Sequence, residues 1–157
     1  MSVALWRIAH ETDRYPADDV SGAARSHADS RWASRGTSVV YCSTNISLAV
    51  LETLCHLTKS VRSSNRFLVR VDIPEAVWEM REVLDAPAGW DAVPPGVTSI
   101  RTGDAWRRSM RSPLLVVPSV VVPEESNVLV NPDHPHARKI RAATIRKWLV
   151  DPRLFRT

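Results

Sequence analysis

The chain has 157 residues, of which 44% are hydrophobic and 24% charged, the composition of an ordinary globular protein that is long enough to bury a core. It has no run of roughly 18 apolar residues, no secretory pattern near its start, and two cysteines (Cys42 and Cys55) without metal-site or disulfide spacing, so we expect a cytoplasmic protein with no membrane helix and no metal. The net charge of +4 comes without any aromatic–basic motif of a nucleic-acid reader, so we expect no direct nucleic-acid contact.

The first third of the chain predicts two strands separated by a long loop. Residues 3–8 predict a strand. Residues 11–37 are polar with little periodicity and predict a loop that contains at most one short helix. A loop this long in a compact domain is usually functional or disordered. β-Branched and aromatic residues then predict a strand over residues 37–43.

A helix and a strand follow. Residues 46–57 are strong helix formers, and Thr44 or Asn45 can cap the helix at its start. Residues 66–73 alternate between apolar and charged side chains, which is typical of a strand, and Pro74 ends it.

The middle of the chain is less regular. Residues 75–84 predict a short helix, and the turn-rich residues 85–96 predict a surface loop. Residues 102–110 predict a further helix, in which Asp104 is favourable near the positive N-terminal end.

The last third predicts several short strands. Residues 114–123 suggest two of them, divided at Pro118 and Ser119, and residues 127–132 suggest another. Residues 137–150 fit either a helix or a strand. These elements together predict a single mixed α+β domain over residues 1–157, with short strands and a few helices. The chain has neither a GxGxxG motif nor a Walker lysine motif, which argues against Rossmann and P-loop chemistry.

Glu52 is the most informative candidate for catalysis. It stands in the middle of the predicted helix among Leu, Ala and Val residues, and a carboxylate on such a helix must be paired or must face a pocket. His56 lies four residues further on, on the same predicted face. The alternative is a structural Glu–His hydrogen bond, or simply the polar stripe of the helix.

Arg31 and Tyr41 are candidates for ligand binding. The guanidinium of an arginine suits a diphosphate, and Arg35 could take the same role. Trp32 is apolar enough to anchor the loop. Tyr41 could stack on a planar ring and hydrogen-bond through its hydroxyl. The alternatives are a surface salt bridge for the arginine and ordinary core packing for the tyrosine.

Polar residues near the predicted C-terminal strands form a further group. Ser119 lies in an apolar stretch and needs a partner if it is buried, but it is not part of a GxSxG elbow. Asn127 and Asn131 suit strand ends and are equally able to face a ligand. His134 and His136 could bind a metal, but no third ligand has suitable spacing, so we expect no metal site.

Four segments in this order resemble the RES family, which is named for an Arg, a Glu and a Ser. They are SRWASRGTSVVYCSTNISLAVLETLCHL, LVRVDIP, VPSVVVPEESNVLVNPDHP and DPRLF. Each motif alone is weak, but the ordered series is fairly specific and covers nearly the whole chain. Many members have a glycine before the Arg–Trp pair and an asparagine after it, where this chain has Ser30 and Ala33.

The resemblance implies a fold related to ADP-ribosyltransferase toxins and an attack on NAD. Glu52 would stabilise the positive charge that develops on the ribose when nicotinamide leaves. Arg31 would hold a phosphate of NAD, and Tyr41 would pack on the nicotinamide or its ribose. The residues expected to bind substrate are Ser119, Asn131, Arg35 and His56.

Three functions are compatible with these residues. The first is a toxin that depletes NAD as a phosphorylase or glycohydrolase, with no cofactor besides the substrate NAD and with inorganic phosphate as a potential co-substrate. The second is a protein ADP-ribosyltransferase that uses the same pocket. The third is a binding or interaction module without catalysis, suggested by the departures at Ser30 and Ala33. The resemblance also implies an Xre-type helix-turn-helix antitoxin as partner. It does not decide whether the chain forms a homodimer within that complex.

Overall fold

The computed structural model describes residues 1–25, 29–57 and 65–155. All of its named strands join one seven-stranded sheet in the order β4-β5-β6-β2-β1-β3-β7. Neighbouring strands are antiparallel except β4 and β5, which are parallel. No helix in the described ranges has the length and apolar character needed to cross a membrane.

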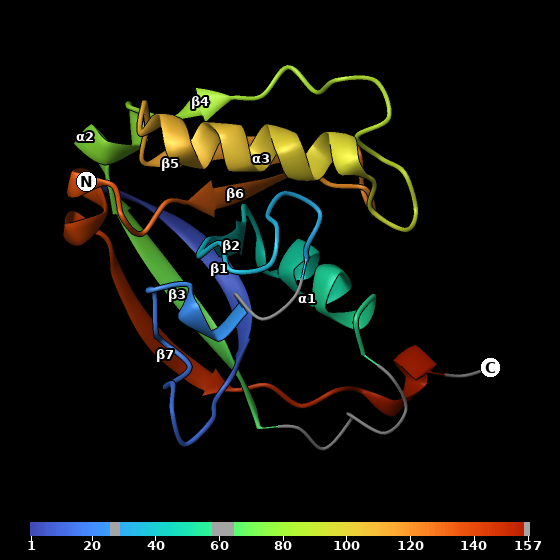
Figure 1. The fold of residues 1–157 in the computed structure, drawn as a ribbon. Helices are drawn as coiled ribbons and strands as arrows, with labels where there is room; N and C mark the ends of the chain where they lie inside the picture. Colours follow the sequence, from blue (N-terminus) through green and yellow to red (C-terminus); the bar gives the residue numbers. More distant parts are fainter. Residues whose placement is uncertain (26–28, 58–64, 156–157) are drawn as a thin grey trace.

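Helices and strands are interspersed along the chain and form one mixed α+β domain, which confirms the predicted fold class (Figure 1). The strands are β1 (Ser2–His10), β2 (Val40–Ser43), β3 (Arg66–Pro74), β4 (Glu82–Val83), β5 (Leu114–Pro118), β6 (Ser126–Val130) and β7 (Arg141–Lys147). The α-helices are α1 (Ile46–Leu54), α2 (Glu75–Trp78) and α3 (Val97–Ser109). Short 3-10 helices occupy Ala23–Arg25, Pro135–Lys139 and Pro152–Phe155.

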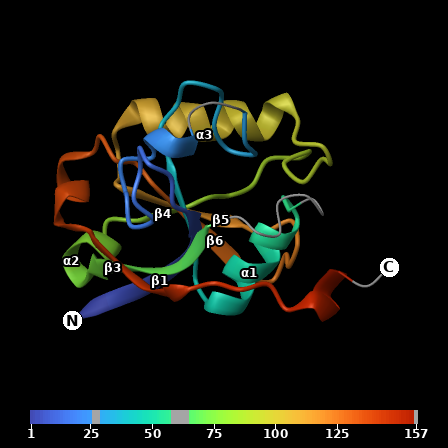
Figure 2. The ribbon, with the colours of Figure 1, turned by 90° about the horizontal axis from the view of Figure 1, so that it is seen from below.

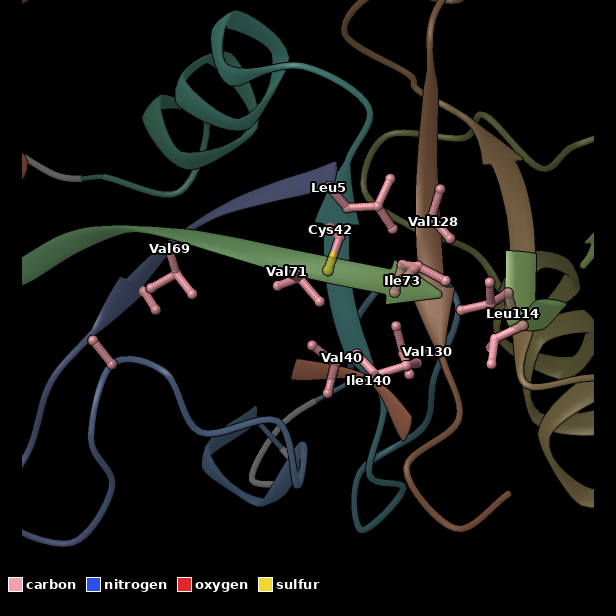
Figure 3. Close-up of a cluster of buried hydrophobic side chains, with 13 residues drawn as sticks. Leu5, Val40, Cys42, Val69, Val71, Ile73, Leu114, Val128, Val130 and Ile140 are labelled. Atoms are coloured by element: carbon pink, nitrogen blue, oxygen red, sulfur yellow. The ribbon is translucent and has the colours of Figure 1, made fainter. Parts of the chain in front are cut away.

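One face of the sheet carries the main hydrophobic core. Strand side chains alternate between faces, so every second residue of the central strands points into this core. Figure 3 shows side chains of β1, β2, β3, β5 and β6 meeting there together with Ile140, which precedes β7. The buried members labelled in the figure are Leu5, Val40, Cys42, Val69, Val71, Ile73, Leu114, Val128, Val130 and Ile140.

The opposite face carries two helices. Ala49 of α1 packs on Ile8 and Leu68, which belong to β1 and β3. Trp106 of α3 packs on residues of β5 and β6 such as Leu115 and Leu129. Figure 1 shows α3 and α1 as separate bodies on this side, with the segment that precedes β2 running between them.

The two halves of the sheet meet at a narrow junction between β1 and β2. These strands share a single registered pair, Trp6 with Ser43, whereas β1 pairs with β3 along its entire length. β2 then pairs with β6 through four residues. The polar end of β2 therefore lies where the two halves of the sheet join.

Helix α1 is shorter than predicted. It begins as expected after Asn45, whose side chain accepts the backbone N–H of Leu48 at 2.8 Å, but it ends at Leu54 and not at residue 57. The amide of His56 bonds to the carbonyl of Thr53, and this tighter turn replaces the helical pattern. The prediction that His56 lies on the helix is therefore wrong. The strand predicted over residues 37–43 also starts later, at Val40.

The region of residues 75–110 differs more. The single helix predicted over residues 75–84 is a one-turn helix, α2, followed by the short strand β4. Helix α3 begins at Val97, five residues before its predicted start, so Asp104 lies in the middle of the helix and not near its positive end. Small residues caused this error, because Ser99 and Gly103 form the buried face with Trp106 but contribute no apolar signal.

The C-terminal strands are partly as predicted. β5 and β6 are present, but the second strand predicted within residues 114–123 is absent. The hydroxyl of Ser119 accepts the amides of Val121 and Val122, which folds this segment into a turn. The ambiguous residues 137–150 resolve into the end of a 3-10 helix and strand β7.

Candidate functional site

The carboxylate of Glu52 is held by two donors from strand ends far away in the sequence. Glu52 lies on α1 and is half-buried. Its Oε1 accepts the hydroxyl of Ser119 and the side-chain amide of Asn127, each at 2.7 Å. Both hydrogen bonds reach the same oxygen, and bonds to a charged acceptor are stronger than neutral ones. The side chain is therefore fixed in one orientation.

Asn127 is itself oriented by a second strand. Asn127 on β6 pairs with Ser43 on β2, and the two side chains share one face of the sheet. The hydroxyl of Ser43 donates to Oδ1 of Asn127 at 2.7 Å, which leaves the NH₂ group of Asn127 to donate to Glu52. The chain Ser43–Asn127–Glu52 thus ties the carboxylate to the junction between the sheet halves.

Ser119 reaches Glu52 from the turn after β5. Its side chain is completely buried, and its hydroxyl accepts the amides of Val121 and Val122 at 3.1 Å each while donating to Glu52. The expectation that a buried serine here needs a partner is confirmed. The hydroxyl of Ser119 donates its hydrogen to Glu52, so Ser119 helps to orient the carboxylate.

The second carboxylate oxygen of Glu52 differs from the first. Neither a side chain nor a backbone group in the described ranges pairs with Oε2. Every buried side-chain oxygen or nitrogen described has a partner, so Oε2 is open to the solvent side. The site therefore holds one carboxylate oxygen and presents the other.

Tyr41 lies on the same sheet face as Ser43, two residues earlier on β2. Its hydroxyl forms a hydrogen bond with the hydroxyl of Ser30. Ser30 also closes a tight turn, because its amide donates to the carbonyl of Ala33 at 2.8 Å and the two residues form an isolated β-bridge. Ser30 and Ala33, noted in the sequence as departures, thus hold the turn that contains Arg31 against Tyr41.

Arg31 points toward the loop that precedes α3. Its Nη1 donates to the carbonyls of Trp90 and Ala92, each at 2.9 Å. The neighbouring Trp32 is buried, and its ring stacks on that of Trp90 with centroids 6.1 Å apart. Among the described contacts only Nη1 of the guanidinium donates hydrogen bonds, so the N–H groups of Nε and Nη2 remain available to a ligand. Residues 85–96, predicted as a plain surface loop, therefore form one wall beside Arg31.

Helix α3 fixes the other side of this turn. Asp104 accepts the amide of Ser34 at 3.0 Å, and Arg107 donates to the carbonyl of Ser38 at 2.8 Å. Gly103 lies directly against the backbone of Trp32, so closely that a Cβ at this position would fall 1.7 Å from the Trp32 carbonyl oxygen. The segment from Ser30 to Ser38 is thus attached to α3 at three points.

Three residues predicted to bind substrate lie elsewhere. Asn131 is buried beyond the far end of β6, where its amide donates to the Arg107 carbonyl and the Met110 sulfur. It caps the end of α3 and is not brought to Glu52. The side chain of Arg35 is exposed, and among the described residues its backbone amide alone is held, by the carboxylate of Asp29. His56 is exposed in the turn after α1.

Asn127 contacts Glu52, although the sequence predicts substrate binding for Asn131 and not for Asn127. In the sequence both asparagines suit a strand end or a position that faces a ligand. The partners of Asn127 are Glu52 and Ser43, 75 and 84 residues away, and nothing local in the sequence indicates them. A polar residue at the start of an otherwise apolar strand was the available signal.

The charge of Glu52 affects a neighbouring thiol. Partial burial and the negative charge of Glu52 raise the pKa of Cys55, which lies three residues further on. Cys42, on the opposite face of β2, is fully buried, and this burial raises its pKa to about 11 although the cation of Arg7 opposes the rise.

Other features of the described residues lie apart from this group. His134 is buried, and its Nδ1 accepts the amide of His136. Burial and the charge of His136 lower the pKa of His134, against a hydrogen bond to the backbone of Met110.

In the described ranges no cluster of three or more His, Cys, Asp or Glu side chains could hold a metal. Two open hollows of about 320 and 300 Å³ do not include Glu52.

Comparison with known proteins places this geometry in a family context. The RES domain family matches residues 4–151. A protein of Sphingobium sp. strain YBL2, named Prs ADP-ribosylating toxin, is 45% identical over 159 residues and is aligned over 99% of each chain. Toxin Res of Yersinia enterocolitica is 34% identical over 83% of this chain and 84% of its own.

The fold is similar to that of a solved structure. A chain of the Mycobacterium tuberculosis MbcT–MbcA toxin–antitoxin complex superposes with a TM-score of 0.62 over 93% of this chain and 85% of its own, at 12% identity.

Proposed function

This chain belongs to the RES domain family, and from that membership we propose that it is the toxin of a toxin–antitoxin pair that breaks the nicotinamide–ribose bond of NAD. The observation that carries the proposal is the carboxylate of Glu52, which is held through Oε1 and open at Oε2. A relative that is 45% identical over its full length and is named an ADP-ribosylating toxin supports the choice of substrate.

The proposed reaction uses the open oxygen of Glu52. When the C1′–N bond of NAD breaks, its electron pair leaves with nicotinamide and positive charge develops on the ribose. In this proposal Oε2 of Glu52 lies beside the ribose and stabilises that charge, while Ser119 and Asn127 keep the carboxylate from turning away. An acceptor oxygen then bonds to C1′ and loses its proton.

We assign substrate binding to the turn around Arg31 and to Tyr41. The Nε and Nη2 donors of Arg31 suit a diphosphate, while Nη1 stays on the loop carbonyls. Tyr41 lies on the sheet face that also carries Ser43 and contacts Ser30 beside Arg31, and it offers a half-buried ring for packing against nicotinamide or its ribose. The fixed turn formed by Ser30 and Ala33 argues against the module without catalysis that these two departures suggested.

The experiment is an assay of NAD turnover with two matched variants. Glu52→Gln keeps the size of the side chain and removes its charge, and we expect it to lower kcat by about 100-fold or more. Glu124→Gln makes the same change at an exposed position next to the β5–β6 turn and is expected to keep full activity. Intact NAD with the wild-type protein, or unchanged turnover in Glu52→Gln, would refute the proposal.

We propose a protein as the acceptor of ADP-ribose, because the 45% identical relative is named for ADP-ribosylation. Incubation of a cell lysate with adenine-radioactive NAD should then transfer radioactivity to a protein, and Glu52→Gln should abolish the transfer. The second candidate is attack by phosphate or water, which the open Oε2 of Glu52 could assist as a base. NAD loss that phosphate accelerates, without radioactivity on protein, would favour this second candidate.

We also propose an antitoxin partner and a cytoplasmic site of action. The structural neighbour was solved as a toxin–antitoxin complex. A helix-turn-helix protein of the Xre type, encoded beside this chain, is the expected partner, and a homodimer within that complex stays a prediction. Expression of the chain alone should stop growth, and co-expression of the neighbouring protein should restore it. Normal growth with high levels of active, uninhibited chain would contradict the proposal.

A further inference from the structure

Trp90 lies next to Arg31, on the loop of residues 85–96 that joins β4 to α3. Figures 1 and 2 show this loop curving round the N-terminal end of α3. Residues 91–95 of the loop are exposed, whereas Trp90 is half-buried. The reaction proposed at Glu52 uses Arg31 but leaves this large, partly accessible aromatic side chain without a role.

The backbone around Trp90 is held in one conformation. The amide of Trp90 donates to the carbonyl of Pro87 at 3.2 Å, and Gly89 has a φ of 86°, which a residue with a side chain rarely adopts. The carbonyls of Trp90 and Ala92 both accept Nη1 of Arg31 at 2.9 Å. The loop therefore holds Trp90 at a defined position beside the guanidinium.

The Trp90 ring is supported from the interior by a second indole. Trp32 is only 2% exposed, and the two rings stack with an angle of 14° between their planes. No group in the described ranges accepts the indole N–H of Trp90, and every buried side-chain nitrogen there has a partner, so this N–H reaches the surface. The accessible part of the Trp90 indole is thus turned away from Trp32.

Trp90 stands at one end of a series of contacts. Tyr41 hydrogen-bonds to Ser30, and the next residue, Arg31, bonds to the carbonyl of Trp90. NAD has its parts in a matching order, with nicotinamide and its ribose at one end, the diphosphate in the middle and adenosine at the other end. With the nicotinamide ribose at Tyr41 and Glu52 and the diphosphate at Arg31, the adenosine extends toward Trp90.

We propose that the accessible part of the Trp90 indole stacks on the adenine of NAD, so that residues 85–96 bind the half of the substrate that does not react. This inference rests on the proposed function, because it concerns the other end of the same substrate. A nucleotide base stacks on an aromatic side chain through its π-face and needs no base-specific hydrogen bond for this contact. Trp90 is then a specificity-determining residue for substrates that carry a base on the diphosphate.

The first measurement is calorimetric titration of the purified chain with AMP and with ribose 5-phosphate, which lacks the base. The wild type should bind AMP about tenfold more tightly, a ratio that base stacking accounts for. Trp90→Leu should lose this advantage, and Trp90→Phe, which keeps an aromatic face, should retain most of it. Trp78→Leu makes the same change at a half-buried tryptophan of α2 and should bind AMP like the wild type.

Steady-state turnover separates stacking from a structural role of Trp90. Trp90→Leu should raise KM for NAD about tenfold and leave kcat unchanged, because binding is lost equally in the ground state and the transition state. The same variant should cleave nicotinamide mononucleotide, which has no adenosine, as the wild type does. An equal loss on both substrates would overturn the proposal, because the substitution would then have disturbed the turn around Arg31.

The titrations decide the matter independently of the reaction. Equal binding of AMP and ribose 5-phosphate by the wild type would overturn the proposal, and this holds even if Trp90→Leu fails to fold. If NAD is not consumed but AMP binding depends on Trp90, the reaction proposed at Glu52 fails and the stacking site stands. If NAD is consumed and Trp90→Leu binds AMP like the wild type, the stacking site fails and the reaction stands.

Discussion

The two oxygens of the Glu52 carboxylate have different surroundings, and this difference is made by residues that do not contact substrate in our proposal. Ser119 and Asn127 both donate to Oε1, and Ser43 determines which end of the Asn127 amide faces the carboxylate. Removing any one of them leaves the charge of Glu52 in place but frees its orientation. Such residues should affect kcat more than KM.

Asn127→Ala tests this positioning role. We expect kcat for NAD turnover to fall about tenfold to 100-fold with KM nearly unchanged, because the carboxylate loses one of its two donors. The hydroxyl of Ser43 also loses its acceptor, which should lower the free energy of unfolding by roughly 1–3 kcal/mol. Steady-state kinetics and urea unfolding measure the two effects.

Asn131→Ala is the matched control for Asn127→Ala. Asn131 is fully buried and also donates hydrogen bonds through its amide, but it holds the end of α3, so its loss should reduce stability and leave kcat per folded molecule near that of the wild type. Equal losses of kcat in the two variants would refute a specific role for Asn127.

His134 gives the molecule a pH-dependent stability. Its pKa in the folded protein lies below the ordinary value of 6.5, so the unfolded chain binds a proton more readily than the folded one. Stability should therefore be complete above about pH 6.5 and fall as the pH drops toward the lowered pKa. Protonation of Nδ1 would also remove the acceptor of the His136 amide.

Thermal unfolding between pH 8 and pH 5 checks this prediction. The Tm of the wild type should decline below about pH 6.5, and His134→Gln should show a smaller decline over the same range. A Tm of the wild type that rises on acidification, or an identical decline in His134→Gln, would contradict the assignment.

At the scale of elements, the proposed NAD site depends on the contact between α3 and the segment from Ser30 to Ser38. Gly103 permits the closest approach, because any side chain there would collide with the carbonyl of Trp32. Asp104 and Arg107 then hold the segment through its backbone. The turn that presents Arg31 is thus positioned by a helix to which the proposed reaction assigns no group.

Gly103→Ala should separate α3 from this turn. A Cβ at 1.7 Å from a backbone oxygen cannot be accommodated without movement, so we expect a loss of about 3 kcal/mol or more in stability and of most NAD turnover. Ala105→Gly, at an exposed position of the same helix, should cost about 1 kcal/mol and keep the activity of the folded protein. Chemical unfolding and NAD assays distinguish the two, and full activity in Gly103→Ala would refute the contact.

The elements also show what the sequence can predict. The strands β1, β3 and β6 and the start of α1 follow from local signals, namely alternation, β-branched residues and an Asn cap. The start of α3 and the strand β4 do not, because the buried face of α3 contains a serine and a glycine and β4 has only two residues. Local sequence patterns do not indicate which other helix or strand each element packs against.

The same division holds for the site. Glu52 is predicted as a candidate because a carboxylate among apolar residues requires a physical reason, and the structure gives it the partners Ser119 and Asn127. The contacts of Asn127 with Glu52 and of Ser30 with Tyr41 do not follow from the sequence, because each joins distant segments. The predicted partnership of Glu52 with His56 depended on helix length, and the helix ends before His56.

At the scale of the whole molecule, ligand binding should stabilise the fold. The proposed NAD site joins α1, the β2–β6 pair, the β5 turn and the Arg31 segment, so a bound molecule would link both halves of the sheet. In Glu52→Gln, which should bind NAD without consuming it, an NAD concentration about 100 times Kd should add roughly 2.7 kcal/mol and raise Tm by about 5–10 °C.

Differential scanning calorimetry of Glu52→Gln with and without NAD measures this shift. Addition of Arg31→Gln to Glu52→Gln should remove most of it, because the diphosphate loses its proposed partner. An equal shift in the double variant would place NAD elsewhere on the molecule.

The unequal environments of the two cysteines also provide a reporter. Reagents that attack thiolates react only where the sulfur is accessible, and Cys42 is sealed in the core whereas Cys55 is exposed one helical turn past Glu52. A maleimide fluorophore applied at mildly alkaline pH would therefore attach to Cys55 alone in the unmodified chain. Its emission would follow occupancy of the neighbouring surface in real time, without any engineered attachment point.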